Sequence, residues 1–205
     1  MTPDLMPSAT PRPRKRARTA RVVLLGGAAF GLAACQPESR VEATVFPSVE
    51  ECQAVADLPE NDFTAQDCAD GFAEAQAIHE ESAPRYADQA LCEEQHGGEC
   101  VAEERAGGGG SIFLPLLAGY MIGNMMGGRG MAAKPLYRTA AGRFATPGAG
   151  TVLSGNRGKT SLGANSFAAS PSTRAAAPLS RAAVQSRGGF GAARTGGMGS
   201  RSFGG

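Results

Sequence analysis

The sequence lacks the motifs of the common enzyme classes. It contains no glycine-rich dinucleotide-binding or phosphate-binding loop, no Gly-x-Ser-x-Gly motif and no Cys-x-x-Cys pair. A catalytic thiol needs a lowered pKa, yet no basic residue stands beside any of the five cysteines. His79 and His96 are the only histidines, and solvated helical positions would explain both. We therefore predict that the protein is not an enzyme and has no catalytic residue and no cofactor.

An apolar run of about 20 residues, the length that a membrane-spanning helix needs, is also missing. Residues 22–34 form an uncharged apolar stretch of thirteen residues, and six basic residues precede it within 12–21. A basic region, a short apolar region and small residues at a cleavage site are typical of an export signal. The sequence therefore predicts a signal peptide over residues 1–34.

This apolar stretch ends at a cysteine. Leu32-Ala33-Ala34-Cys35 resembles the bacterial lipobox, Leu-(Ala/Ser)-(Gly/Ala)-Cys, at all four positions. The resemblance implies a lipoprotein of the bacterial cell envelope, cleaved before Cys35 and held in the membrane by acyl chains such as palmitate on that residue. Enteric lipoproteins with aspartate after the cysteine stay in the inner membrane, so Gln36 favours the outer membrane. An ordinary signal peptide with a coincidental cysteine is the alternative.

Acidic residues are absent from the last third of the chain. Residues 36–106 hold eighteen acidic residues and three arginines, whereas residues 134–205 hold ten basic residues and no acidic one. Such an asymmetry suggests parts that behave differently. We predict five parts: the signal peptide 1–34, the acylated N-terminus and linker 35–47, an acidic helical cysteine-containing domain 48–105, a Gly-rich linker with an apolar segment 106–133, and a basic tail 134–205.

Capping residues predict three helices in the acidic domain. One starts at Ser48, one runs from Asp62 or Thr64 to Pro84, and one runs from Asp88 to Gly97. Within the second helix, Cys68, Phe72 and Ala75 recur at helical spacing, so one face could pack on a core. The predicted fold class is therefore mainly α.

The acidic domain has few large apolar side chains. Twelve of them in about 70 residues are fewer than a hydrophobic core alone usually needs. Four cysteines remain besides Cys35, and an even number in an exported chain predicts two disulfides. The pattern of an aromatic residue, a cap and a cysteine occurs at 46–52 and again at 86–92, each followed by one more cysteine. This repeat favours Cys52–Cys68 and Cys92–Cys100 over the two crossed pairings.

Cys92, His96 and Cys100 allow a second interpretation. Their side chains could supply sulfur and nitrogen ligands to a metal ion, with Cys68 or His79 as a fourth ligand. Because the spacing is not a standard zinc pattern and an oxidising compartment favours the disulfide, we predict no metal site. A periplasmic thiol- or metal-binding protein that uses these three residues stays as the alternative.

A second apolar segment, residues 112–126, contains no charged residue. Gly119, Gly123 and Gly127 stand four residues apart, which would place them on one face of a helix. Small residues at this spacing let helices approach closely in membranes. We predict a short Gly/Met-rich apolar helix that contacts the membrane or self-associates, and packing against the acidic domain is the alternative.

The basic tail, from Lys134 onwards, is rich in Gly, Ala, Ser and Arg. It has too little apolar surface to offset the entropy of ordering, so we predict that it is disordered. An Arg-Gly-Gly stretch within 186–191 resembles nucleic-acid-binding segments, but an exported chain rarely meets nucleic acid, and none is expected as a partner. The expected contacts are anionic lipid, lipopolysaccharide or the acidic segment of the same or a neighbouring chain.

The order of these features is similar to that of the YgiB family, bacterial exported proteins and lipoproteins of unknown function. The likeness rests on residues 83–86 (APRY), 113–128 (FLPLLAGYMIGNMMGG), 134–137 (KPLY) and 187–191 (RGGFG). It implies that Cys52, Cys68, Cys92 and Cys100 are the family's four cysteines, with a longer spacing between the first two in this chain. The family has no established catalytic residues, so none is carried over.

These observations predict a function of interaction rather than catalysis. An acyl anchor, a disulfide-stapled domain and a cationic tail together describe a non-enzymatic lipoprotein of the cell envelope. Its expected role is structural or in binding, such as envelope integrity or surface association.

Overall fold

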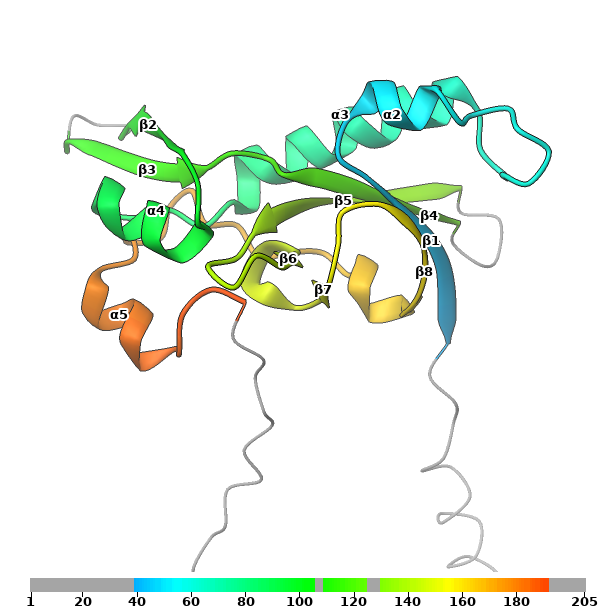
Figure 1. The fold of residues 1–205 in the computed structure, drawn as a ribbon. Coiled ribbons are helices and arrows are strands. Elements are labelled where there is room, and N and C mark those ends of the chain that lie inside the picture. Colours follow the sequence, from blue (N-terminus) through cyan, green and yellow to red (C-terminus); the bar gives the residue numbers. More distant parts are fainter. Residues whose placement is uncertain (1–38, 106–108, 125–129, 192–205) are drawn as a thin grey trace, which may run out of the picture. The chain divides into compact units, whose positions relative to one another are not determined.

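The computed structural model describes residues 39–105, 109–124 and 130–191 (Figure 1). The predicted signal peptide over residues 1–34, Cys35 and Gly127 lie outside the described residues. Helices and strands each make up about 30% of the structure. The prediction of a mainly α fold is therefore wrong, and the fold is a mixture of helices and antiparallel sheet.

Six strands form an antiparallel sheet that curls into a half-barrel (Figure 1). The strand order is β7-β6-β5-β4-β1-β8. From one edge to the other, the strands are β7 (Val152–Leu153), β6 (Phe144–Ala145), β5 (Met131–Arg138), β4 (Gly119–Asn124), β1 (Arg40–Phe46) and β8 (Gly158–Gly163). The central strands β1 and β4 pair with Val45 opposite Met121. Strand β1, the first described strand, therefore lies between β4 and β8, which come much later in the sequence.

The two faces of the sheet bury different cores because side chains alternate along each strand. The long helix α3 (Ala65–Ser82) and the short helix α2 (Val49–Gln53) cover one face (Figure 1). The core beneath them includes Phe46, Phe63, Tyr120, Ile122 and Ala133. The core on the other face includes Val41, Val45, Met121, Leu136 and Phe167.

The predicted helix caps are confirmed. Ser48 Oγ accepts a hydrogen bond from the backbone N–H of Glu51 (3.3 Å), and Thr64 forms a complete capping box with Asp67. Asp88 caps α4 (Gln89–His96). Gly97 ends α4 in the left-handed conformation, with φ +58°, which is the usual helix C-terminal geometry of glycine. These local signals act within one helical turn, which is why the sequence predicts them well.

A smaller sheet lies beside α4. Strands β2 (Cys100–Glu104) and β3 (Ser111–Pro115) pair antiparallel, and Tyr86 bridges β3 to Leu179. Leu179 belongs to the C-terminal strap, which we define as residues 171–191. The strap also contains helix α5 (Arg181–Ser186), so the end of the described chain packs against residues almost 100 positions earlier.

The helix predicted over the apolar segment 112–126 does not form. Residues 112–115 and 119–124 belong to strands β3 and β4 instead, and every residue of β4 except Asn124 is buried. Gly119 adopts φ +145°, and a Cβ there would lie 2.6 Å from the carbonyl oxygen of Phe46. At Gly123 a Cβ would lie 2.5 Å from the Phe167 ring. These glycines allow close packing inside a sheet, and the helical face on which membrane contact or self-association was predicted is absent.

The basic tail is not disordered between Lys134 and Gly191. This stretch forms most of β5, then β6, β7, β8, two short 3₁₀ helices (Pro147–Ala149 and Ala164–Phe167) and α5. Its buried side chains include Leu136, Tyr137, Leu153, Phe167 and Val184. These few apolar side chains do not indicate a core by themselves, because the surface that covers them comes from β1, β3, β4, α4 and the C-terminal end of α3.

Candidate functional site

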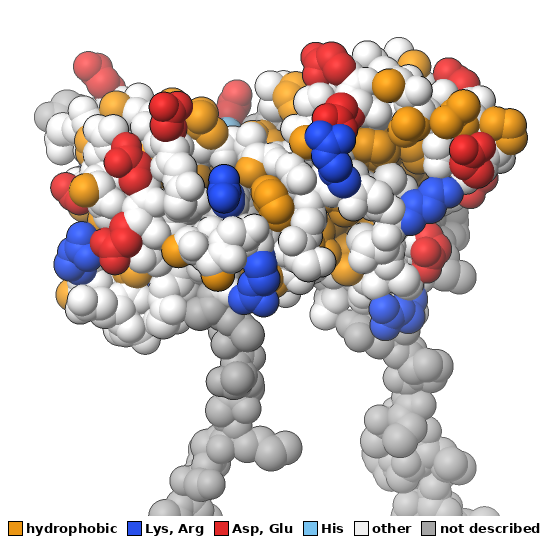
Figure 2. All heavy atoms as spheres, in the orientation of Figure 1, with side chains coloured by type: hydrophobic (Ala, Val, Ile, Leu, Met, Phe, Trp, Pro, Cys, Tyr) orange, Lys and Arg blue, Asp and Glu red, His pale blue; other side chains and the backbone are white. Residues whose placement is uncertain are grey.

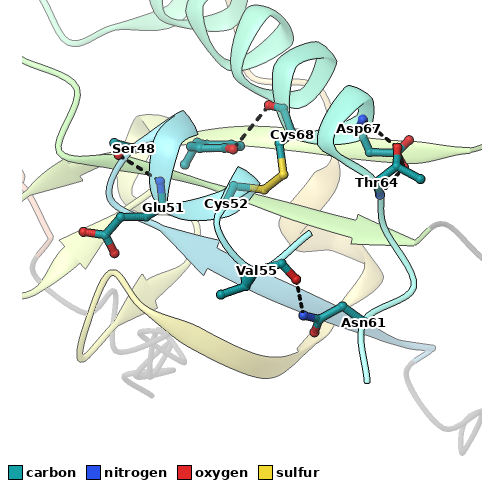
Figure 3. The surroundings of a disulfide bond; sticks show 9 residues. Ser48, Glu51, Cys52, Val55, Asn61, Thr64, Asp67 and Cys68 are labelled. Atoms are coloured by element: carbon teal, nitrogen blue, oxygen red, sulfur yellow. Dashed lines mark hydrogen bonds between the residues drawn. A yellow bond between two sulfur atoms is a disulfide. The ribbon is translucent and has the colours of Figure 1, made fainter. Parts of the chain in front are cut away.

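The first disulfide joins the two helices that cover the sheet. Cys52 of α2 and Cys68 of α3 are bonded, with Cα atoms 5.7 Å apart and no exposed surface on either residue (Figure 3). The Tyr120 hydroxyl donates a hydrogen bond to the Cys68 carbonyl (3.2 Å). Asn61 donates to the Val55 carbonyl (2.8 Å) and closes the loop between the helices. The disulfide therefore closes the loop between α2 and α3, and the Tyr120 hydrogen bond ties α3 to the sheet.

The second disulfide, Cys92–Cys100, joins α4 to β2 with Cα atoms 6.2 Å apart. Both pairings are those that the sequence repeat favours. Neither sulfur is a thiolate in this bond, so a thiol- or metal-binding role for Cys92, His96 and Cys100 would first require its reduction. Within the described part of the chain, no three His, Cys, Asp or Glu side chains come together in a way that could hold a metal ion.

His96 lies in a buried aromatic cluster, contrary to the solvated position expected for it. Its Nδ1 lies 2.7 Å from the carbonyl oxygen of Arg138, and its Nε2 lies 3.0 Å from the hydroxyl of Tyr86. A carbonyl only accepts, so Nδ1 carries the proton and Nε2 accepts from Tyr86. Burial lowers the pKa of His96 to about 4, and burial also raises the pKa of Tyr86. Both groups are therefore neutral structural elements at pH 7.

The cluster continues to a second histidine. His79 Nδ1 lies 3.0 Å from the hydroxyl of Tyr137, and burial is the main reason that the pKa of His79 is lowered. Phe190 of the strap packs on His96, with ring centroids 4.4 Å apart, and lies 6.1 Å from the Tyr137 ring. Helices α3 and α4, strand β5 and the strap thus meet at one aromatic junction.

Arg85, in the stretch 83–86, connects the end of α3 to the strap. It is only 5% exposed. Its guanidinium donates to the carbonyl oxygen of Glu80 (2.6 Å) and to the hydroxyl of Thr173. The backbone N–H of Leu179 donates to the Arg85 carbonyl (2.7 Å). The side chain and the backbone of Arg85 therefore both hold the strap in place.

A pocket of about 220 Å³ opens between this arginine and the strap. Its lining combines apolar side chains with Arg85, Tyr86 and Arg187, and no Asp or Glu is among the described residues that line it. The wall also contains Ala149, whose φ of +56° is rare for a residue other than glycine. Strained backbone of this kind concentrates at functional sites. We take this pocket as the candidate binding site.

Sequence reasoning did not identify this pocket. The stretch 83–86 indicates only a family resemblance. The stretch 187–191 indicates the same resemblance and is also similar to a nucleic-acid-binding motif. The structure brings them together, because Arg85 and Tyr86 from the first and Arg187, Gly189 and Phe190 from the second line the same cavity. Their joint occurrence in the family pattern was the one signal in the sequence that pointed to this site.

Among the described residues, the other sequence-predicted positions do not line the pocket. Gly119 and Gly123 are buried in β4, and Cys35 and Gly127 lie outside the described residues. None of the helices that the structure describes is both long enough and apolar enough to cross a membrane.

Comparison with known proteins identifies the family. A family model described as "Protein of unknown function (DUF1190)" matches residues 40–200, more than half of the chain. The chain belongs to the DUF1190 family. This result confirms the resemblance to YgiB-like proteins. The match includes both 83–86 and 187–191, so the pocket lies within the family domain.

Curated relatives of this DUF1190 protein are also of unknown function. The chain is 29% identical to UPF0441 protein SG0265 of Sodalis glossinidius over 182 residues, which covers 85% of this chain and 81% of the relative. It is 30% identical to UPF0441 protein PC1_0312 of Pectobacterium carotovorum over 187 residues, covering 85% and 80%. A UPF0441 protein of Serratia proteamaculans is 32% identical over 130 residues, and this match spans 58% of the chain and 56% of that relative. No solved structure matches the chain.

Proposed function

We propose that this DUF1190 protein is a non-catalytic lipoprotein of the bacterial cell envelope, anchored through acyl chains on Cys35. The observation that supports the proposal most strongly is the combination of a lipobox at Leu32–Cys35 with two disulfides in the folded domain that follows. Disulfides persist in oxidising compartments such as the periplasm, so the anchor and the domain point to the same side of the inner membrane.

The membrane is the principal partner in this proposal. Gln36 after the lipid-bearing cysteine favours the outer membrane over the inner membrane. The proposed contact is between exposed basic side chains, such as Arg138 and Arg143, and anionic lipid headgroups or lipopolysaccharide. Self-association stays a prediction, and we expect no nucleic-acid partner.

The intact mass of the mature protein tests the anchor. We expect a diacyl or triacyl mass on Cys35 in the wild type, and a Cys35→Ala variant that has no acyl mass and leaves the membrane fraction. Gln36→Asp is the matched control, because it should keep the acyl mass and shift the protein towards the inner membrane. An unacylated wild-type N-terminus would overturn the proposal.

Thiol titration tests the assignment of the cysteines. The unreduced mature protein should show no reactive thiol, because Cys35 is acylated and the other four cysteines form two disulfides. Two or more reactive thiols would contradict this assignment and would favour the thiol- or metal-binding alternative.

A further inference from the structure

We propose that the pocket between Arg85, Arg187 and Phe190 binds a small amphiphilic carboxylate, with its anionic group at the arginines and a compact apolar body inside the cavity. This inference goes beyond the proposed envelope role and does not depend on the acyl anchor. It depends on the charge of the lining, the size of the cavity and the rigidity of its walls.

The charge of the lining favours an anion. Residues 36–106 have a net charge of −15 from eighteen acidic residues and three arginines, yet no carboxylate from the described residues lines this pocket. Arg187 is exposed and forms no ion pair with any described residue. A planar guanidinium in this position can bind a carboxylate through two parallel hydrogen bonds.

Arg85 adds positive charge from the inner wall. Its guanidinium donates to neutral oxygens and also forms a long ion pair with Glu103 (3.9 Å), whose side chain is 48% exposed. The carbonyl oxygens at the end of α3 offset part of this charge through the helix dipole. Arg85 is therefore a structural residue, and the part of its positive charge that is not offset attracts an anion. Arg187 is the side chain that can bind the anion directly.

The remaining lining favours an apolar body. Leu179, Val184 and Phe190 line the cavity together with Pro84 and several alanines. A cavity of 150 Å³ lined by apolar side chains holds benzene, so the 220 Å³ here corresponds to about nine non-hydrogen atoms. A complete membrane acyl chain is too large for this volume. The size limits the ligand to a short-chain or single-ring carboxylate.

The walls of the pocket are held in place without a ligand. Leu179 forms backbone hydrogen bonds with Arg85 and Ala87, and the Phe190 N–H donates to the Gln95 side chain (2.9 Å). Gly148 and Ala149 also line the pocket, and the Ala149 N–H donates a hydrogen bond to the Thr146 carbonyl (2.8 Å). A preformed cavity avoids the entropy loss of ordering a flexible site, which favours binding of small ligands.

The test uses the full chain with Cys35→Ser and three unbranched probes with seven carbon atoms each: heptanoate, 1-heptanol and heptylammonium. Binding is measured by titration calorimetry and by NMR shifts of residues around Phe190. We expect saturable binding of heptanoate with a Kd on the order of 1 mM, the value for a ligand of about nine atoms with ordinary efficiency. Heptanol should bind about tenfold more weakly, because it lacks the charged hydrogen bond, and heptylammonium should not bind.

Two variants separate the charge from the cavity. Arg187→Gln should weaken heptanoate binding about tenfold and leave heptanol binding unchanged. Arg174→Gln is the matched control, since Arg174 is an exposed arginine of the same strap that does not line the pocket. Ala177→Phe should fill the cavity and abolish binding of both probes. Urea midpoints equal to that of the parent chain show that each variant is folded.

Three results would overturn the proposal. Equal affinity for heptanoate and heptanol would show that the arginines do not contribute to binding. Acetate competing as well as heptanoate would show an adventitious ion site without an apolar subsite. No saturable shift near Phe190 with heptanoate would show that the pocket is not a ligand site. None of these results bears on acylation of Cys35, so failure here and failure of the anchor are distinguishable.

Discussion

Residues 39–105 and 130–191 contribute to the domain in different ways. The first region carries α2, α3, α4 and both disulfides, whereas the second carries strands β5 to β8 and α5 and contains no cysteine. Both nevertheless bury side chains in shared cores, as Tyr137 of β5 does beside His79 of α3. The first region contains both disulfides, whereas the second has no disulfide among its described residues and is held by strand pairing, hydrogen bonds and apolar packing.

The opposite charges of the two regions do not explain why they associate. Arg157 contacts Glu51 and Arg181 contacts Glu94 (2.7 Å), but all four side chains are at least 40% exposed. In the view of Figure 2, acidic and basic side chains are interspersed on the surface. Exposed ion pairs contribute little to stability. The comparison therefore teaches that apolar burial and the pairing of β1 with β8 join the regions, and that the charges mainly cover the outside.

Removal of the strap should have the largest effect on how the two regions stabilise each other. A chain that ends at Ser170 loses the apolar contacts of Leu179, Val184 and Phe190, and we expect its free energy of unfolding to fall by about 5 kcal/mol. Urea denaturation measures this change. A chain that ends at Gly191 keeps these contacts and is the matched control. Equal urea midpoints for the two chains would show that the strap adds nothing to the core.

Acid should weaken the junction where the regions meet. Neutral His96 is buried with a pKa of about 4, below the value of about 6.5 for an unfolded histidine. The unfolded chain therefore binds more protons between these values, so stability should fall as the pH drops from about 6.5 to 4, by about 3 kcal/mol in total.

Urea midpoints across this pH range measure the acid effect. His79, whose pKa is also lowered, should add to the loss in the same direction. His96→Gln removes one titrating group, and its stability should depend less on pH in this window. An unchanged pH dependence in that variant would mean that His96 is not the group responsible.

Overpacking at Gly123 tests a contact between β4 and the second region. The ring of Phe167 leaves no room for a Cβ there, so Gly123→Ala should lower the free energy of unfolding by about 2 kcal/mol. The double variant Gly123→Ala, Phe167→Leu should be more stable than the sum of the two single changes predicts. Thermal unfolding measures both, and strict additivity would show that the two residues do not touch.

The smallest effect is expected from the surface charges. Arg157→Gln and Glu51→Gln should each change the free energy of unfolding by less than about 1 kcal/mol, because the pair is exposed. A double-mutant cycle in low and high salt measures the pair alone. A coupling well above this limit would mean that charge, and not apolar burial, joins the two regions.

The parts of the structure that could be predicted are those with short-range causes. Ser48, Thr64 and Asp88 cap helices because their side chains reach a backbone N–H three residues away. The disulfide pairing followed from a repeat in the sequence. The strands at 111–115 and 119–124 could not be predicted, because an apolar run of this length suits a helix or a strand equally well, and here pairing with β2, β1 and β5 decides between them.

The candidate site could not be predicted from short stretches of sequence, for the same reason. Arg85 and Arg187 are separated by about 100 residues of chain, and each alone is compatible with an exposed loop. Their meeting at one pocket depends on the backbone pairing of Tyr86 with Leu179 and on Phe190 packing against His96. The composition of the tail also led to a wrong prediction of disorder for residues 134–191. A few apolar side chains are enough for this stretch to fold when other strands cover them.

The sequence by itself determined the helix caps, favoured the observed pairing of the cysteines and carried the resemblance to the family. Each of these depends on residues a few positions apart or on a recognisable order of short motifs. Only the tertiary structure decided that residues 111–115 and 119–124 are strands, that residues 134–191 fold and that two distant motifs form a pocket. The physical reason is that a strand gains its hydrogen bonds and its buried surface from partners elsewhere in the chain, which no local pattern records.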